Sequence, residues 1–577
     1  MAATRQGKGN GTVRVAAAQF AVGTDVDANL QTCLHWLRAA GQCRPDLVVL
    51  PEFANHASWY DDGEHCWRVS VELDGPFIAA IAAAAAEIQA YVVVNCTVRR
   101  EPPTCTGTSV LISPQGEVLA TNDKQVLIGH ENLFLQRARE PGPIVDTPLG
   151  RLGLYACMDG VVAETPRCLA LRGAQILCNS LNSFATDEGS LHIPVRAAES
   201  RVFVVAANKV GALIPEALLE PVSAQTGIPV RFLSGAGDSQ IVAPDGTVLA
   251  MASADQAEVI WADIDVSAVE RALRPDGTDV IAARRPLLYA EIAADPAQQP
   301  EPVFSGAAAL KVAAVQLPGL GEGALPFAVD AVRRAVADGA RYVVLPELFL
   351  ASPRDGHDPA ALAVRSREAV AALSAACGEA RVALNIVEAS GSGHALVAVL
   401  LDRNGIQLRQ PLLHPSARYG WSQPGAQIQT LQLGDAHVAV LSGDDAIYPE
   451  VSRLLAIRGV DLLLVPCAPL EAWELRTGLV ERAAENRMNL VAACQPGALG
   501  TSLIAALQKD FTVLTPWTER PFDGLLSQPV LTRAAPVPGI TQATVHPANA
   551  ANKVVSVGTD MVRGRAWWLS GPIVKPN

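Results

Sequence analysis

The chain has 577 residues, of which half are hydrophobic and 18% are charged, so it can build large buried cores and is not a disordered chain. A formal net charge of −13 without a basic cluster excludes a nucleic-acid-binding surface. Residues 1–11 are polar but no apolar signal segment follows them, and the most apolar run, Phe77 to Ala86, is too short to cross a bilayer. We therefore expect a cytoplasmic protein with no nucleic-acid partner and no membrane partner.

The 11 cysteines are odd in number and no two are spaced as Cys-x-x-Cys, which fits neither a disulfide framework nor a zinc site. The segment Ser234-Gly-Ala-Gly-Asp-Ser239 resembles a phosphate-binding loop, but such a loop must run into a helix. Here the residues that follow read as strand, turn and strand. We expect no metal, no nucleotide and no cofactor.

Apolar strands alternate with amphipathic helices through the first half of the chain, which predicts an α/β fold. Strands are predicted at 13–20, 46–53, 91–98, 152–156, 175–178 and 202–208, helices at 27–40, 76–90, 164–172 and 192–201, hairpins at 108–121 and 237–249, and an extended basic tail at 279–286.

After the Pro-rich stretch Asp295 to Pro302 the same pattern begins again. The matching pairs of segments, in the same order in both halves, are 13–20 with 310–317, 47–53 with 342–348, 196–201 with 482–487, and 277–284 with 558–565. The chain is therefore a tandem duplication, with a first copy over residues 1–294, a linker over 295–306 and a second copy over 307–577.

The segment around Cys157 predicts a strand, a tight turn and a helix, with the cysteine at the turn. Free N–H groups at the start of a helix can lower the pKa of a thiol or bind an oxyanion. A cysteine at a strand end is by itself more often a small buried hydrophobe. Glu52, after an apolar strand, and Lys124, after a hairpin, are by themselves ordinary surface charges.

Taken together and in order, Glu52, Lys124 and Cys157, with Arg196-Ala-Ala-Glu199 and Asn208, resemble the nitrilase, or carbon–nitrogen hydrolase, superfamily. The resemblance extends from Val13 to about Pro286. It implies an αββα sandwich for each copy, so we expect two tandem nitrilase-like domains arranged as an intramolecular pseudo-dimer. A further homo-oligomer is left open.

The resemblance also implies a Glu–Lys–Cys triad, whose chemistry suits cleavage of a C–N bond. Cys157 is the thiol nucleophile, and a desolvated Glu52 takes its proton and returns it to the leaving amine. Lys124 and the backbone N–H of Met158 stabilise the oxyanion. Glu131 matches a second family glutamate that holds the lysine and the substrate.

The family often has an aromatic residue after the cysteine and Phe-Pro before the glutamate that matches Glu164, whereas this chain has Met158 and Val162-Ala163. The run Met158-Asp159-Gly160 is more similar to the amidase branches than to true nitrilases. We therefore expect hydrolysis of an amide or N-carbamoyl group in a small molecule through an acyl-thioester. The alternatives are acyl transfer from the same thioester to an amine, and a non-catalytic binding scaffold.

Specificity is expected in the loops 56–67 and 180–190, where Trp59, Tyr60 and His65 either line the pocket or only pack at the surface. Asp159 and Glu164 are expected to shape the turn and pair with arginine side chains.

The second copy keeps Glu347, but alignment places Gly443 at the nucleophile position, and no lysine follows the hairpin at 402–405. His414 then has no nucleophile to serve and is interpreted as structural. We expect a degenerate copy that supports the active-site loops of the first.

Overall fold

The computed structural model describes residues 11–304, 306–352 and 358–576, and the chain forms two compact units. Unit 1 contains the chain up to Ala272 together with Asp510–Leu526 and Val554–Pro572, and unit 2 contains Leu273–Lys509, Ser527–Lys553 and the last residues from Ile573. The first ten residues, considered above as a candidate signal, lie outside the described residues.

The compact units do not follow the sequence copies. Residues 273–294 of the first copy belong to unit 2, and two segments of the second copy belong to unit 1. The boundaries at 294 and 307 describe the sequence repeat, and as domain boundaries they stay a prediction.

Unit 1 is built on two six-stranded sheets. The first sheet has the order β12 (Glu258–Asp265), β1 (Thr12–Gln19), β2 (Leu47–Val49), β3 (Tyr91–Arg99), β4 (Cys105–Ile112) and β5 (Val118–Asp123). The second has the order β11 (Val248–Met251), β10 (Gln240–Val242), β9 (Phe203–Ala207), β8 (Ile176–Ser180), β7 (Gly150–Ala156) and β6 (Val145–Thr147).

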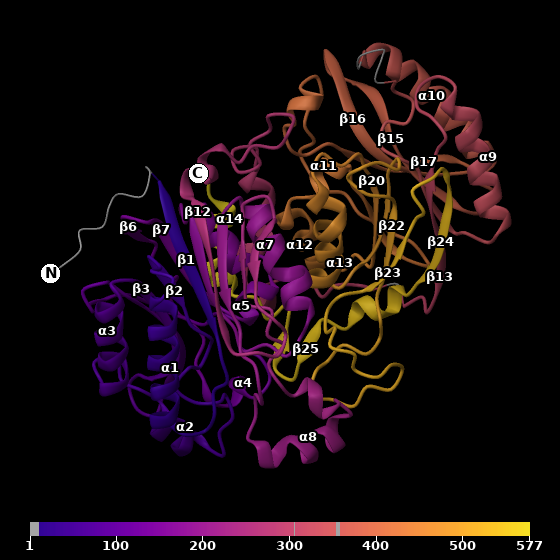
Figure 1. Ribbon diagram of the computed structural model, residues 1–577. Helices are drawn as coiled ribbons and strands as arrows, with labels where there is room; N and C mark the ends of the chain where they lie inside the picture. The colour runs from indigo at the N-terminus through magenta and orange to yellow at the C-terminus, as the bar shows by residue number, and fades with distance from the viewer. Residues whose placement is uncertain (1–10, 305, 353–357, 577) are drawn as a thin grey trace. The chain divides into compact units, whose positions relative to one another are not determined.

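Alternation along the strands produces four layers. In β1, Val15 and Ala17 face the second sheet, where they meet apolar residues of β7, β8 and β9, while Ala16 and Ala18 face helices. Helices α1 (Val26–Gly41) and α3 (Pro76–Ile88) cover the first sheet, and Figure 1 shows both beside β1, β2 and β3. Helices α6 (Glu164–Leu171) and α7 (Ile193–Ser200) cover the second sheet. The predicted αββα sandwich is confirmed.

Unit 2 repeats this topology strand for strand. Its first sheet has the order β17 (Gly405–Pro411), β16 (Gly393–Asp402), β15 (Arg381–Ser390), β14 (Tyr342–Val344), β13 (Leu310–Gln316) and β24 (Gly539–Val545). Its second has the order β18 (Leu431–Gln432), β19 (His437–Val440), β20 (Leu462–Pro466), β21 (Asn489–Ala493), β22 (Leu503–Ala506) and β23 (Val530–Arg533).

Helices again cover both sheets of unit 2. They are α9 (Ala324–Ala337) and α10 (Pro359–Ala376) on one side, seen beside β15 and β17 in Figure 1, and α12 (Pro449–Ile457) and α13 (Leu479–Asn486) on the other. The α/β fold class and the tandem sandwich domains are therefore as expected from the sequence. How the two copies pair concerns the placement of the units and stays a prediction.

The tail at 279–286 is not extended as expected. The N–H of Ala283 closes a turn on the carbonyl of Asp279, and a 3₁₀ helix follows at Pro286–Ala293. The structure adds α2 (Gly63–Val69), α8 (Leu219–Thr226) and the strand β12, which the sequence pattern did not single out. The loop at 234–239 does run into the hairpin β10–β11, as predicted.

The remaining elements are short. They are the helices α4 (Glu131–Phe134), α5 (Met158–Val161), α11 (Gly443–Ala446) and α14 (Gly571–Val574), the strands β25 (Val554–Ser556) and β26 (Thr559–Asp560), two π-helices at 188–192 and 474–478, and further 3₁₀ turns at 216–218, 230–232, 266–271, 296–298, 417–419, 547–551 and 567–569. Within the described residues, the helices all lack the length and apolarity needed to cross a bilayer.

Candidate active site

Cys157 lies at a strained backbone position between β7 and α5. Its φ of 47° and ψ of −110° fall outside the regions that non-glycine residues normally adopt. Its N–H donates to the carbonyl of Ser180, at the end of β8, over 3.0 Å. The neighbouring parallel strand thus fixes the cysteine at the carboxyl edge of the sheet, which is where α/β folds place their ligand sites.

Glu52 is brought to the same edge by hydrogen bonds between the two sheets. Its N–H donates to the carbonyl of Leu181 over 3.0 Å, and the hydroxyl of Ser180 donates to the carbonyl of Leu50 over 2.8 Å. The end of β2 is therefore tied to the segment that also holds the N–H of Cys157.

Lys124 joins two acidic side chains in the interior. Its Nζ lies 2.8 Å from Glu52 Oε1 and 2.9 Å from Glu131 Oε1, and all three residues are buried. Oε2 of Glu131 accepts the N–H of Ile128, so the glutamate is held by its own loop. The structure thus brings three of the sequence-predicted residues into direct contact, and their charges also act on Cys157.

Asp159 ties the lysine segment to the elbow at Cys157. Its Oδ1 accepts the N–H groups of Gln125 over 2.9 Å and Val126 over 2.7 Å. Asp159 accepts these hydrogen bonds from the backbone, whereas the sequence predicted a pair with an arginine. The arginine that supports the elbow is Arg196, whose guanidinium donates to the carbonyl of Gly160 over 2.8 Å.

Burial and charge shift the pKa values of Glu52, Cys157 and Lys124. Burial raises the pKa of Glu52 to about 7, against the lowering effect of Lys124. Burial, followed by the charge of Glu52, raises the pKa of Cys157 well above that of an ordinary thiol. Burial opposes the charge of Lys124, but the carboxylates of Glu131 and Glu52 hold its pKa well above the usual value.

The helix after Cys157 therefore does not produce a low thiol pKa. Helix α5 has only four residues, so its dipole is small, and the thiol is desolvated beside a carboxylate. The raised pKa favours the protonated thiol form of Cys157.

Met158 begins α5, so its N–H has no acceptor within the helix. Its side chain is buried in an apolar cluster that includes Val126 and Phe522. Trp59 stacks on His130, beside Glu131, with ring centroids 4.4 Å apart.

Of the other two aromatic candidates, Tyr60 packs in the interior and its hydroxyl bonds Thr97 at 2.7 Å, so it is a core residue. His65 is partly exposed and pairs with Asp61. Trp59 thus remains the candidate for the pocket wall.

The loop that carries Glu131 is clamped by a segment from the second sequence copy. The hydroxyl of Ser556 accepts the N–H of Gly129 over 2.8 Å. The hydroxyl of Thr559 accepts from Asn132 Nδ2 over 2.9 Å. No local pattern in the sequence pointed to this clamp, because its partners lie more than 400 residues apart.

A second segment from that copy, residues 510–526, covers the loop at 180–190. The N–H of Thr186 donates to the carbonyl of Gly524 over 2.8 Å, and the rings of Phe184 and Phe522 lie 5.6 Å apart. A Cβ on Gly524 would lie 2.9 Å from the ring of Phe232, so the close approach needs glycine.

Unit 2 contains an equivalent position for each part of this site. Oxygens of Asp445 accept the N–H groups of the two residues after Leu412, which is the pattern that Asp159 forms with the two residues after Lys124. Leucine thus stands in place of the lysine. The residue two positions before Asp445 is Gly443, so a glycine stands where unit 1 has its elbow cysteine.

The equivalent site is filled by ion pairs. Glu347 Oε2 accepts the N–H of Gly443 over 3.0 Å, and Glu347 Oε1 lies 3.1 Å from Arg418. Arg418 also pairs with Asp444 over 2.6 Å, and Arg274 pairs with Asp444 over 2.8 Å. A Cβ on Gly443 would lie only 2.7 Å from that of Cys467, so the position has no room for a side chain.

His414 is part of the structural network of unit 2. Its Nδ1 lies 2.8 Å from Asp445 Oδ1, its Nε2 bonds the hydroxyl of Tyr289, and its ring stacks on Tyr448.

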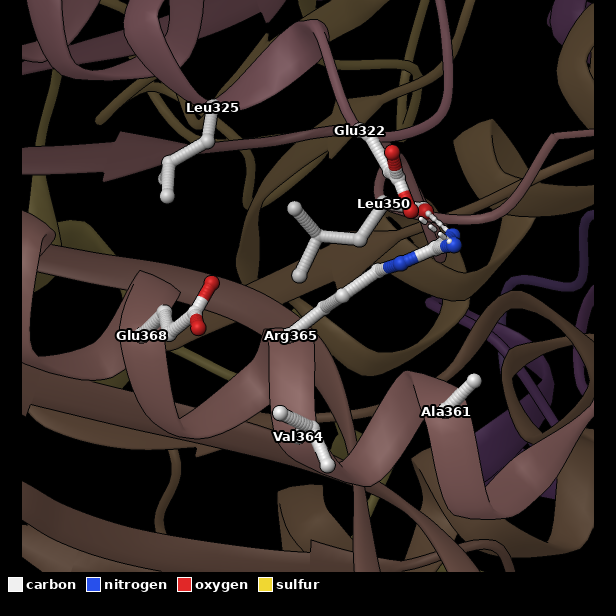
Figure 2. Close-up of a pocket in the computed structure, with 7 residues that line it drawn as sticks. All are labelled: Glu322, Leu325, Leu350, Ala361, Val364, Arg365 and Glu368. Carbon is white, nitrogen blue, oxygen red and sulfur yellow. Dashed lines mark hydrogen bonds and ion pairs between the residues drawn. The ribbon is translucent and has the colours of Figure 1, made fainter.

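A surface cleft of about 500 Å³ lies in unit 2 beside α9 and α10. Figure 2 shows the guanidinium of Arg365 beside both the carboxylate of Glu322 and the backbone carbonyl of Leu350. None of the described residues that line this cleft carries a thiol or hydroxyl nucleophile. Similarly, the described part of the chain contains no cluster of three or more His, Cys, Asp or Glu side chains arranged for a metal ion.

The chain matches the family model for carbon–nitrogen hydrolases twice, over residues 14–274 and 311–522. A nitrilase from Pyrococcus abyssi is 25% identical over 264 residues, which are 46% of this chain and 93% of that protein. Deaminated glutathione amidase from Bos taurus is 28% identical over 296 residues, covering 48% of this chain and 84% of the relative.

Two solved structures are similar at lower identity. The Caenorhabditis elegans NitFhit protein is 24% identical with a TM-score of 0.41, covering 48% of this chain and 66% of that one. An amidase from Nesterenkonia is 22% identical with a TM-score of 0.38, covering 45% and 95%.

Two matches in tandem define a duplicated enzyme fold, and each relative cited here spans about one copy. The chain belongs to the carbon–nitrogen hydrolase family of the nitrilase superfamily.

Proposed function

We propose that unit 1 hydrolyses an amide or N-carbamoyl group of a small molecule through a thioester on Cys157. The observation that carries the proposal is the buried contact of Lys124 with Glu52 and Glu131, at the sheet edge where Cys157 sits in a strained turn. A buried cation between two carboxylates is costly to build, and such arrangements cluster at functional sites.

The first step removes the thiol proton. Glu52 accepts the proton from the Sγ of Cys157 as the sulfur attacks the carbonyl carbon, which forms the C–S bond. The carbonyl oxygen becomes an oxyanion, and the Nζ of Lys124 and the N–H of Met158 stabilise it. Glu131 holds the lysine in place throughout.

The second step breaks the C–N bond. Glu52 returns the proton to the leaving nitrogen, and ammonia or an amine departs to leave the acyl group on Cys157. Glu52 then takes a proton from water as the water oxygen attacks the thioester carbon. The C–S bond breaks to release the acid product, and Glu52 returns the proton to the sulfur, which restores the thiol. A carboxyl with a pKa of about 7 is suited to both directions of transfer near neutral pH.

The substrate class follows from the elbow and its relatives. The run Met158-Asp159-Gly160 favours amides over nitriles, and amidases occur among the similar proteins. The side chain of Met158 faces an apolar cluster, which favours an uncharged group on the substrate near the oxyanion.

We further propose that unit 2 is not catalytic. A thiol at position 443 would clash with Cys467, and Arg418 is already paired with both Glu347 and Asp444. In this reading the second copy serves the first through the segments at 510–526 and 554–572.

The test is release of ammonia or amine across a panel of amides, N-carbamoyl amines and nitriles, with Cys157→Ala as the control. Activity on amides that is lost in the variant supports the proposal. Turnover of nitriles alone would contradict the substrate class.

The same assay separates the alternatives. A panel of primary amines at low concentration tests acyl transfer, because a transferase then forms an amide in place of the acid product, whereas a hydrolase still releases the acid. For the scaffold alternative, an electrophilic amide analogue followed by peptide mass mapping is decisive: a scaffold leaves Cys157 unmodified.

A further inference from the structure

A second lysine, Lys209, is buried in unit 1 near Glu52. It lies two residues after the end of β9, and only 1% of it is exposed. Its Nζ donates to the carbonyl oxygen of Phe53, the residue after Glu52, over 3.4 Å. A lysine is almost never this deeply buried unless its charge interacts with a partner.

The backbone at Phe53 is itself unusual. Its φ of 49° is in the left-handed region, and its N–H donates to Asn95 Oδ1 over 3.0 Å. The turn that carries Glu52 is therefore held from both ends, by Asn95 at the N–H and by Lys209 at the carbonyl. A shift of this turn moves the carboxylate of Glu52.

The second copy shows which part of this arrangement the fold requires. The N–H of Asn208 donates to a serine hydroxyl, that of Ser239, over 2.8 Å, and the N–H of Cys494 donates likewise to Ser502 over 3.0 Å. Asn208 and Cys494 are therefore equivalent, so the counterpart of Lys209 is Gln495.

Unit 2 forms the same left-handed turn without a lysine. Leu348 has a φ of 42°, and its carbonyl accepts the backbone N–H of Ala351 over 2.8 Å. Gln495 bonds elsewhere, to the N–H of Leu317 and the carbonyl of Gly319. The turn can thus be satisfied by backbone alone, and a lysine stands at this position in the unit that also has Lys124 and Cys157, whereas unit 2 has Gln495 there.

We propose that Lys209 is a positioning residue for the reaction, which supports the Glu52 turn through the Phe53 carbonyl and supplies a second positive charge that favours the ionised form of Glu52, the form that accepts the thiol proton. This inference rests on the proposed role of Glu52 as the base.

The charges around Glu52 and Lys209 agree with a role of Lys209 in positioning and charging Glu52. Glu52 interacts with Lys124, Glu131 and Lys209, and its field reaches Cys157. Lys209 interacts electrostatically with titratable groups from four other segments of the chain. These groups are Glu52, Cys157, Cys33, Cys96 and His56. Burial lowers the pKa of Lys209 to about 8, while the charge of Glu52 opposes that shift, so the ammonium form persists at neutral pH.

The test measures the rate at which iodoacetamide alkylates Cys157, as a function of pH, in the full-length protein. Mass mapping of the Cys157 peptide separates it from the other cysteines. The rate falls on the acid side because protonated Glu52 cannot accept the thiol proton. In Lys209→Met the neutral side chain no longer favours the carboxylate, so this acid limb moves to higher pH by roughly 1 unit.

Lys553→Met is the matched control. Lys553 is another buried lysine, which donates to the carbonyls of Asn486 and Arg487 in unit 2. Its loss should lower the melting temperature without moving the acid limb. Lys209→Gln, which copies Gln495, provides a second variant at the site itself and should also move the limb.

The outcomes are distinct. A limb that stays in place in a folded Lys209→Met or Lys209→Gln protein overturns the proposal, and so does failure of both variants to fold, because the role is then structural. If the acid side of the pH profile is the same in Glu52→Gln as in the wild type, the proposed function itself is contradicted. If Glu52→Gln changes the acid side of the pH profile but Lys209→Met does not, only the role of Lys209 is contradicted.

Discussion

The hydroxyl of Thr559 donates a hydrogen bond to the carbonyl of Leu127 over 2.7 Å, across 432 residues of sequence. Leu127 lies in the loop between Lys124 and Glu131, so a residue of the second copy helps to fix the carboxylate that holds the site lysine. Proteins position catalytic groups through such supporting contacts, and small displacements of them are costly for rate.

The first prediction concerns this clamp. Thr559→Val removes the hydrogen bonds to Leu127 and Asn132 but keeps the size of the side chain. We expect kcat to fall by about 10- to 100-fold, because Glu131 and Lys124 lose their fixed geometry. Steady-state kinetics with an amide substrate measures this.

The matched control for the clamp is Thr278→Val. Thr278 is the counterpart of Thr559 in the other copy, and its hydroxyl accepts the N–H of Ala417 within unit 2. It should leave kcat unchanged. Equal losses in the two variants would indicate a general effect on folding and contradict the clamp.

The second prediction concerns Lys124. In Lys124→Met, Glu52 and Glu131 lose the cation that lies between them in the interior. Leaving buried carboxylates without their partner costs about 3–5 kcal/mol of unfolding free energy, and the oxyanion loses its main donor. Denaturant titration and kinetics should show both losses. A variant with normal turnover would exclude Lys124 from the reaction.

The third prediction concerns pH. Because burial raises the pKa of Glu52 to about 7, kcat/KM should decline as the pH falls through that value. The pH at which kcat/KM declines reports the titration of Glu52 together with the groups coupled to it. Glu52→Gln should abolish turnover over the whole pH range.

The same raised pKa has a consequence for stability. Between pH 4.5 and about 7 the folded protein keeps a proton on Glu52 that the unfolded chain has lost. The unfolding free energy should therefore decrease as pH rises through this window, by the contribution of this group. Thermal melts over this pH range, compared between Cys157→Ala and Cys157→Ala/Glu52→Gln, isolate the contribution of Glu52 to the pH dependence of stability. The slope should be shallower in the double variant.

The fourth prediction tests the second copy. In the double variant Cys157→Ala/Gly443→Cys, the new thiol has no lysine beside it and its Cβ meets Cys467. We expect no turnover and no adduct at position 443 with an electrophilic amide analogue. Recovery of activity would show that unit 2 is a latent enzyme.

The fifth prediction concerns a fragment of residues 1–294. It lacks the segments at 510–526 and 554–572, which complete unit 1 and bury Met158 and Val162 in an apolar cluster. Exposed apolar surface of this kind promotes aggregation. Light scattering and an amidase assay should show an aggregating, weakly active fragment, rescued by co-expression with residues 295–577. A stable and fully active fragment would contradict the supporting role of the second copy.

The alternation of strands and helices and the duplication could be predicted from the sequence, because they depend on hydrophobic periodicity and on turns, which are local properties of the chain. The αββα architecture was expected only through the resemblance to the nitrilase superfamily. Glu52, Lys124 and Cys157 each follow a recognisable strand or hairpin, but the family resemblance was needed to group them into one site and to add Glu131.

Tertiary structure alone decided how these groups behave. The raised pKa of the Cys157 thiol comes from desolvation beside Glu52, and burial is a property of the folded interior. The clamp by Thr559 and the charge of Lys209 beside the Glu52 turn also depend on contacts between distant segments. A linear pattern describes only neighbours along the chain, so the sequence determined which residues reach the site, while packing determined their protonation and what holds them there.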